Sequence, residues 1–167
     1  MKNELNKLAA IGLGIGVVFG IAGGAFSDPI QQGIVYEISS LGLTAALALL
    51  AVKYLRSGQD QAAAGFIVFA VGEGVMTAGS PAGGQVATSS FGAGMALYIP
   101  ALLLIIAKPC FPLWTRITGA AAMVPFGIAA ARIFLGHEVG YADALPGAGY
   151  GLLSLTMIGW IIELVRE

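Results

Sequence analysis

Charged side chains are scarce in this sequence. Only 10% of its 167 residues are Asp, Glu, Lys or Arg, whereas 57% are hydrophobic. Soluble domains carry about 25% charged residues, so this chain lacks the polar surface of a water-soluble globule and lipid is expected to surround most of it. The net charge of −1 also excludes a strongly basic surface of the kind that binds nucleic acid, and no nucleic-acid partner is expected.

Cysteine and histidine are rarer still, with one residue of each type. Cys110 therefore has no partner for an internal disulfide. A bis-histidine haem within one chain is impossible, and the acids near His137, which are Glu138 and Asp143, do not complete a metal site. No set of nucleophile, base and orienting acid, no phosphate-binding loop and no zinc-ligand spacing is apparent. The sequence predicts neither a metal nor a cofactor, and it favours a role other than catalysis.

Long apolar runs are what the sequence does contain. A membrane-spanning helix needs about 20 mostly apolar residues, and six segments qualify, separated by short turn-like stretches. We expect these spans at residues 8–26, 34–54, 62–79, 89–107, 117–136 and 149–164. The expected fold is an all-α integral membrane protein, a compact bundle of six transmembrane helices. Because no connecting loop is long enough to hold another domain, residues 1–167 are expected to form a single domain.

The basic residues predict the orientation of this bundle. With six spans, all but one of them fall on the same side: Lys2, Lys7, Lys53, Arg56, Lys108, Arg116 and Arg166. The loops on the other side hold acids and no Lys or Arg. The positive-inside rule then places both termini in the cytoplasm, and we expect a plasma (inner) membrane location. Trp114 and Trp160 are expected at the inner boundary, where tryptophan anchors helices to the interface.

Glycine recurs every fourth residue in the stretch GLGIGVVFGIAGG, at Gly12, Gly16, Gly20 and Gly24. We call these four residues the glycine ribbon. In water each interior glycine costs a helix about 1 kcal/mol relative to alanine, but in lipid small residues let helix backbones approach closely. The ribbon is expected to pack on a neighbouring helix of the same bundle, with Gly16 and Gly20 in close contact. The alternative is an interface in a homo-oligomer or a larger membrane complex.

A weak internal repeat also runs through the chain. The letters FGIA occur at residues 19–22 and 126–129, and FAVG occupies the matching place at residues 69–72. All three segments lie in spans that run in the same direction across the membrane. The repeat suggests that the bundle consists of three helical hairpins of similar design.

Three ionisable residues, Glu37, Glu73 and Arg132, lie within the predicted spans, all in the outer half of the membrane. A charge facing lipid at mid-depth costs at least about 2.5–3.5 kcal/mol, so we expect the three to meet inside the bundle. Arg132 would hold one carboxylate in a bidentate pair, and the second acid, left without a counter-charge, would favour its neutral form. Nearby hydroxyl groups are expected to complete a polar pocket: Tyr36, Ser39, Ser40 and Thr77.

Two classes of function follow from these features. The first is a small transporter or channel-like protein that moves a small solute or a proton through the Glu/Arg pocket. Glycines on both sides of Glu73 and prolines inside two spans, Pro100 and Pro125, favour this class, because transporters bind substrates where helices are interrupted. The second is a non-catalytic membrane subunit that packs into a larger complex through the glycine ribbon. A membrane enzyme, or a lipid- or pigment-binding protein that uses the same pocket, is a third and weaker alternative.

Overall fold

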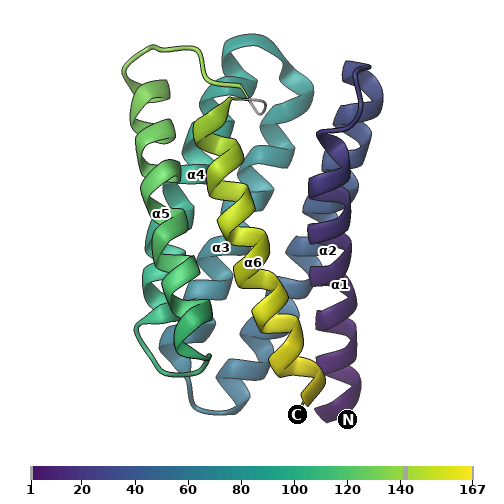
Figure 1. The fold of residues 1–167 in the computed structure, drawn as a ribbon, viewed down its shortest axis with the longest axis vertical. Coiled ribbons are helices and arrows are strands. Elements are labelled where there is room, and N and C mark those ends of the chain that lie inside the picture. The colour runs from purple at the N-terminus through teal and green to yellow at the C-terminus, as the bar shows by residue number, and fades with distance from the viewer. Residues whose placement is uncertain (1, 141–142, 167) are drawn as a thin grey trace.

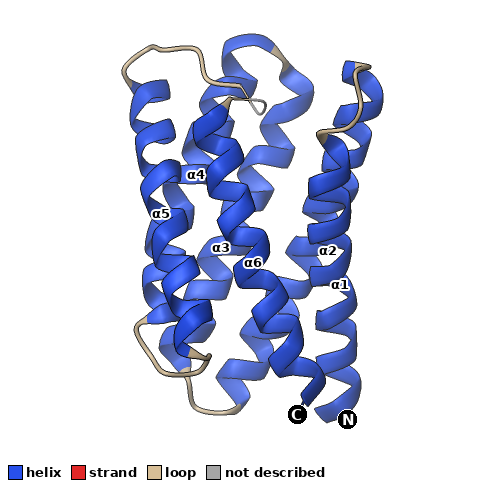
Figure 2. Ribbon diagram, viewed as in Figure 1, coloured by secondary structure: helices blue, strands red, loops and turns tan. Residues whose placement is uncertain are grey.

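The computed structural model describes residues 2–140 and 143–166, and the side chains of residues 2 and 3 are not described. Within these residues the chain forms six α-helices and one short 3-10 turn. They are α1 (Lys2–Gly23), α2 (Pro29–Arg56), α3 (Asp60–Gly79), η1 (Ser80–Ala82), α4 (Gly84–Ile106), α5 (Leu113–Phe134) and α6 (Ala144–Arg166). Figure 2 shows these helices joined by short loops.

All six helices are long and apolar enough to cross a membrane, which confirms the predicted spans and the fold class. Each helix begins before its expected first residue, whereas α1, α4 and α5 end before their expected last residue. At the start of α2, for example, the side chain of Asp28 accepts hydrogen bonds from the backbone N–H groups of Ile30 and Gln31, at 2.8 and 3.0 Å. Pro29 occupies the first helical position, where its missing N–H is not needed. This cap starts the helix before the apolar run begins.

The helices form a closed ring in chain order (Figure 1). Each helix packs on its neighbours along the chain, and α1 packs on α6 to close the ring. Both termini lie at the same end of the bundle, which we call the terminal end. We call the opposite end, which carries η1 and the loop between α5 and α6, the distal end.

Two of the three hairpins cross where both helices carry glycine. A Cβ atom added to Gly12 in α1 would lie 2.7 Å from the carbonyl oxygen of Gly42 in α2. A Cβ atom on Gly94 in α4 would lie 2.9 Å from the carbonyl oxygen of Gly72 in α3. Neither crossing has room for a side chain, so the backbones are in direct contact, as small residues permit between helices in lipid. We call these two contacts the glycine crossings.

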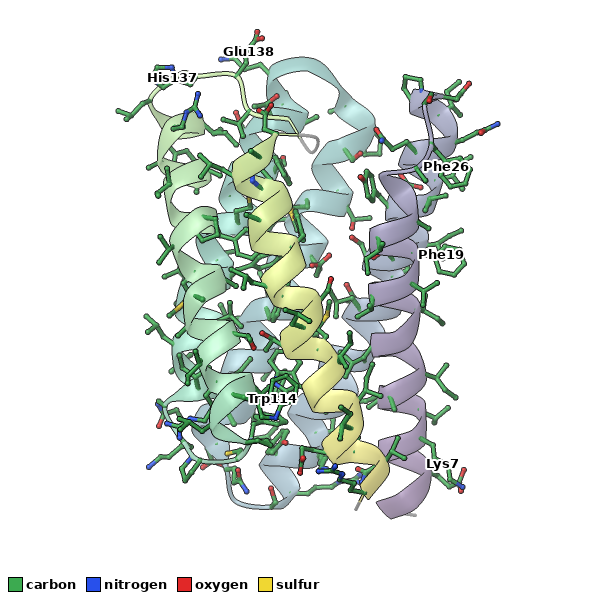
Figure 3. All side chains as sticks on the ribbon, in the orientation of Figure 1. Lys7, Phe19, Phe26, Trp114, His137 and Glu138 are labelled. Carbon is green, nitrogen blue, oxygen red and sulfur yellow. The ribbon has the colours of Figure 1, made fainter. Side chains whose placement is uncertain are left out.

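Aromatic side chains fill the centre of the ring toward the terminal end. The ring of Phe66 lies 5.2 Å from that of Trp160 and 5.4 Å from that of Tyr54, and Phe111 lies 5.6 Å from Trp160. Trp160 is only 1% exposed, so its predicted role as an interfacial anchor is wrong. Trp160 lies near the end of α6, at a depth that suits the membrane–water interface, but its side chain points into the bundle. Trp114, at the start of α5, is exposed (Figure 3).

Candidate functional site

A cavity of about 770 Å³ lies between α1, α2, α3 and α6 in the distal half of the bundle. Its position follows from the size of the residues that face the centre of the ring. Around Trp160 on α6 the interior is filled by large aromatic side chains. Farther toward the distal end the walls include many small residues: Gly16, Gly20, Ser39, Ser40, Gly147, Gly151 and Ser154. The change from large to small residues leaves the distal half hollow.

Each wall is one stripe of a helix. On α2 the lining residues Tyr36, Glu37, Ser40 and Leu43 recur every three or four positions, which places them on one face. The lining residues of α3 do the same: Glu73, Met76, Thr77 and Ser80. The acids and hydroxyl groups predicted from the sequence on α2 and α3 therefore all border one space.

Glu73 is the buried acid of this site, with 3% of its surface exposed. The hydroxyl of Ser40 donates a hydrogen bond of 2.7 Å to one carboxylate oxygen, Oε2. The hydroxyl of Tyr98 donates a short hydrogen bond to the other oxygen, Oε1. Thr77 contributes differently from what was expected, because its hydroxyl donates to the backbone carbonyl of Glu73 at 2.9 Å rather than to the carboxylate. Neutral donors thus hold both carboxylate oxygens at the cavity wall.

Tyr98 on α4 is a member of the site that sequence reasoning missed. Its ring is fully buried between Phe69, at 4.5 Å, and Phe126, at 5.1 Å. Counted from the turn between α3 and α4, Tyr98 lies deeper than Glu73. Helical side chains, however, point toward the N-terminus of their own helix, and this direction lifts the hydroxyl of Tyr98 toward Glu73. The signal in the sequence that points to this residue is a polar hydroxyl group, that of a tyrosine, within an otherwise apolar span.

Tyr36 and Glu37 lie nearer the distal end of α2 than Ser40. Glu37 is exposed, although it lines the cavity. The ring of Tyr36 packs directly over Gly23 of α1, where a side chain would collide with it. Glycine at position 23 thus seats this aromatic ring against α1.

The glycine ribbon of α1 faces α2. Added Cβ atoms would lie 3.3 Å from Leu43 at Gly16 and 3.2 Å from the hydroxyl of Ser39 at Gly20, and Gly12 belongs to the first glycine crossing. The hydroxyl of Ser39 also donates a hydrogen bond of 2.7 Å to the carbonyl of Gly16. Gly24 differs, because it lies just past the end of α1, and an added Cβ there would meet only the carbonyl oxygen of Ile21. Phe19 points away from the bundle (Figure 3).

Arg132 does not join this site, and the expected ion pair with Glu37 or Glu73 is wrong. Arg132 is exposed in the last turn of α5, and no ion pair among the described residues joins it to either acid. The helix α5 packs on α4 and α6, and its backbone adjoins neither α2 nor α3. A similar depth in the membrane suggests that Arg132 pairs with one of the acids, but α5 lies on the other side of the ring from α2 and α3. Near a helix end a long Arg side chain reaches the polar headgroup layer.

The loops at the two ends of the bundle hold the remaining reactive side chains. His137 and Glu138 lie exposed at the distal end (Figure 3). At the terminal end, the thiol of Cys110 donates a short hydrogen bond to the side-chain carbonyl of Gln59, and partial burial raises the pKa of the thiol. Within the described residues no three His, Cys, Asp or Glu side chains are placed to hold a metal ion.

The six apolar helices define a multi-pass membrane protein that lies in a lipid bilayer. No protein-family model matches the chain, and neither the curated proteins nor the solved structures contain a match.

Proposed function

We propose that this protein is a small transporter or channel-like protein whose solute site is the cavity beside Glu37 and Glu73. The observation that carries the proposal is a cavity of about 770 Å³ that reaches a buried, hydrogen-bonded carboxyl group within the membrane-spanning region. Its volume lies within the range of about 300–1,000 Å³ that is typical of small-molecule sites. Ionisable residues inside a membrane are costly and commonly mark solute or proton pathways.

The distribution of Lys and Arg between the two ends of the bundle predicts the side of the membrane on which this site lies. If the positive-inside rule holds, the terminal end lies in the cytoplasm and the cavity lies in the outer half of the membrane. In a plasma (inner) membrane the site would then face the outside. The aromatic cluster around Phe66 and Trp160 would close the cytoplasmic side.

The alternative, a non-catalytic subunit that docks through the glycine ribbon, has weaker support. Gly12 and Gly16 are buried, and both pack on α2 of the same chain. Two of the four ribbon residues are therefore not accessible to a second copy or to a larger complex. Packing between α1 and α2 of the same bundle is sufficient to explain why these two positions are glycine.

Flux through purified protein in liposomes tests the proposal. Currents driven by gradients of small cations, anions, zwitterions and protons would be measured on solid-supported membranes, with neutral solutes followed by liposome swelling. We expect at least one class to give protein-dependent flux that Glu73→Gln abolishes. Ser154→Trp, which fills the cavity, should abolish it as well.

The matched control is Ser89→Trp, which adds the same side chain at an exposed position of α4 outside the cavity. This variant should conduct like the unmodified protein. Folding of each variant would be checked by monodisperse elution in detergent. Absence of flux for every class, or flux that both cavity variants leave unchanged, would overturn the proposal and favour a structural subunit.

A further inference from the structure

We propose that the cavity selects lipophilic organic cations. This inference rests on the proposed function and names the class of solute. It follows from the charge of the lining, from its apolar and aromatic character, and from the residues at its rim.

The charge of the lining is one-sided. Glu37 and Glu73 both border the cavity, and no Lys, Arg or His of the described part of the chain does so. Among the described residues, the neutral hydroxyls of Ser40 and Tyr98 donate to the Glu73 carboxylate. The exposed Arg132, which was expected to neutralise one acid, lies on a helix whose backbone adjoins neither α2 nor α3. A positive charge on a bound solute would supply the counter-charge that the described part of the chain does not provide.

The rest of the lining is suited to an apolar body rather than to a bare metal ion. Leu43, Leu153, Met76 and Met157 all border the cavity, and flexible thioethers adapt to irregular apolar shapes. Tyr36 and Tyr150 also border the cavity, and aromatic side chains attract cations. A bare metal ion would instead require several converging oxygen ligands, and no such group of acids exists in the described residues.

The rim of the cavity is apolar where α1 faces α6. Ile21 on α1 and Leu155 on α6 are 65% and 50% exposed, and Ile158 on α6 is 39% exposed, and all three belong to the lining. The two helices approach each other at the terminal end and lie farther apart toward the distal end (Figure 1). An apolar rim on the membrane-facing side favours solutes that partition into the bilayer. The exposed Glu37 would meet such a cation first, and the buried Glu73 would meet it inside.

Binding of two ions of opposite charge tests the inference. Tetraphenylphosphonium and tetraphenylborate have nearly the same size and shape, so a difference between them reports charge alone. Equilibrium dialysis against the protein in nanodiscs, with empty nanodiscs subtracted, should show saturable binding of tetraphenylphosphonium and none of tetraphenylborate. Tetramethylammonium, a cation without the apolar body, should bind at least tenfold more weakly.

Three variants locate the binding. Glu73→Gln should weaken tetraphenylphosphonium binding at least tenfold, and Glu37→Gln should weaken it severalfold. The control Glu163→Gln removes an acid at the other end of the bundle, where it pairs with Arg166, and should leave binding unchanged. Equal binding of the two tetraphenyl ions, or unchanged binding in Glu73→Gln, would overturn the inference.

The failure of this inference is distinguishable from the failure of the proposed function. If the flux assay shows Glu73-dependent movement of anions, neutral solutes or protons alone, and tetraphenylphosphonium does not bind, the cavity is a solute site but not one for lipophilic cations. If neither flux nor binding depends on Glu73, both proposals fail together.

Discussion

The carboxylate of Glu73 is costly to place in a membrane interior, and its two hydroxyl partners offset that cost. Each oxygen accepts one hydrogen bond, from Ser40 on α2 and from Tyr98 on α4. Three helices thereby meet at one side chain. A buried acceptor that loses its donor costs free energy comparable to its desolvation, so the two donors stabilise the fold as well as orient the acid.

Removal of one donor should therefore destabilise the protein. We expect Tyr98→Phe to lower the free energy of unfolding by about 1–3 kcal/mol, because it leaves Oε1 of Glu73 without its hydroxyl donor. The measurement is reversible unfolding in mixed micelles. In a Glu73→Leu background the same change should cost much less, since no acceptor remains to be satisfied. Equal losses in the two backgrounds would show that the hydroxyl of Tyr98 does not stabilise this carboxylate.

The sequence allowed only part of this residue-scale picture to be predicted. Spacing of three or four positions places Tyr36, Glu37 and Ser40 on one face of a helix, and the structure has them all at the cavity. Contacts between helices also depend on how each helix is rotated about its axis and on which helices are neighbours. Depth in the membrane alone predicts that Arg132 pairs with an acid, but its helix lies on the other side of the ring. The contact of Tyr98 with Glu73 is likewise not predictable without knowing which helices are neighbours and how each is rotated.

At the scale of the helices, hydropathy found every span but not its ends. Each of the six predicted spans corresponds to one of the helices α1 to α6, because a run of about twenty apolar residues is typical of a membrane-spanning helix. Each helix begins before its apolar run, since the residues between the cap and that run, such as those that follow Asp28 in α2, are already helical. Hydropathy registers where side chains become polar, whereas the helix ends where its backbone hydrogen bonds end.

The glycine crossings provide the prediction at this scale. We expect Gly12→Ala to lower the free energy of unfolding by about 1–3 kcal/mol, because the added methyl group would press on the carbonyl of Gly42 and separate α1 from α2. Gly14→Ala, on the same helix, meets no atom within 4 Å and should be neutral or slightly stabilising, since alanine is the better helix former. Thermal unfolding in micelles compares the two variants. A larger loss at Gly14 than at Gly12 would contradict the direct contact of the backbones.

At the scale of the whole molecule, the asymmetry of charge predicts the direction of insertion. Alkaline phosphatase fused after Ser80 should be active, because that site should lie outside the cytoplasm. A fluorescent protein fused after Arg166 should fluoresce, because that site should lie inside it. The reason is the excess of Lys and Arg in the loops of the terminal end. Paired alkaline phosphatase and fluorescent protein fusions measure both sides. An external reporter after Arg166 would invert the orientation and place the cavity in the inner half of the membrane.

The contact between α1 and α6 has a consequence for circular permutation. Both termini lie at the terminal end, and their helices pack on each other, so a short flexible linker can join them as the existing loops join the other pairs. A chain reopened at the exposed Gly83, at the distal end, would keep every contact between helices, including both glycine crossings. In that permuted chain α6 and α1 would become a hairpin of their own, which means that the packing of this ring does not depend on the place where the chain begins.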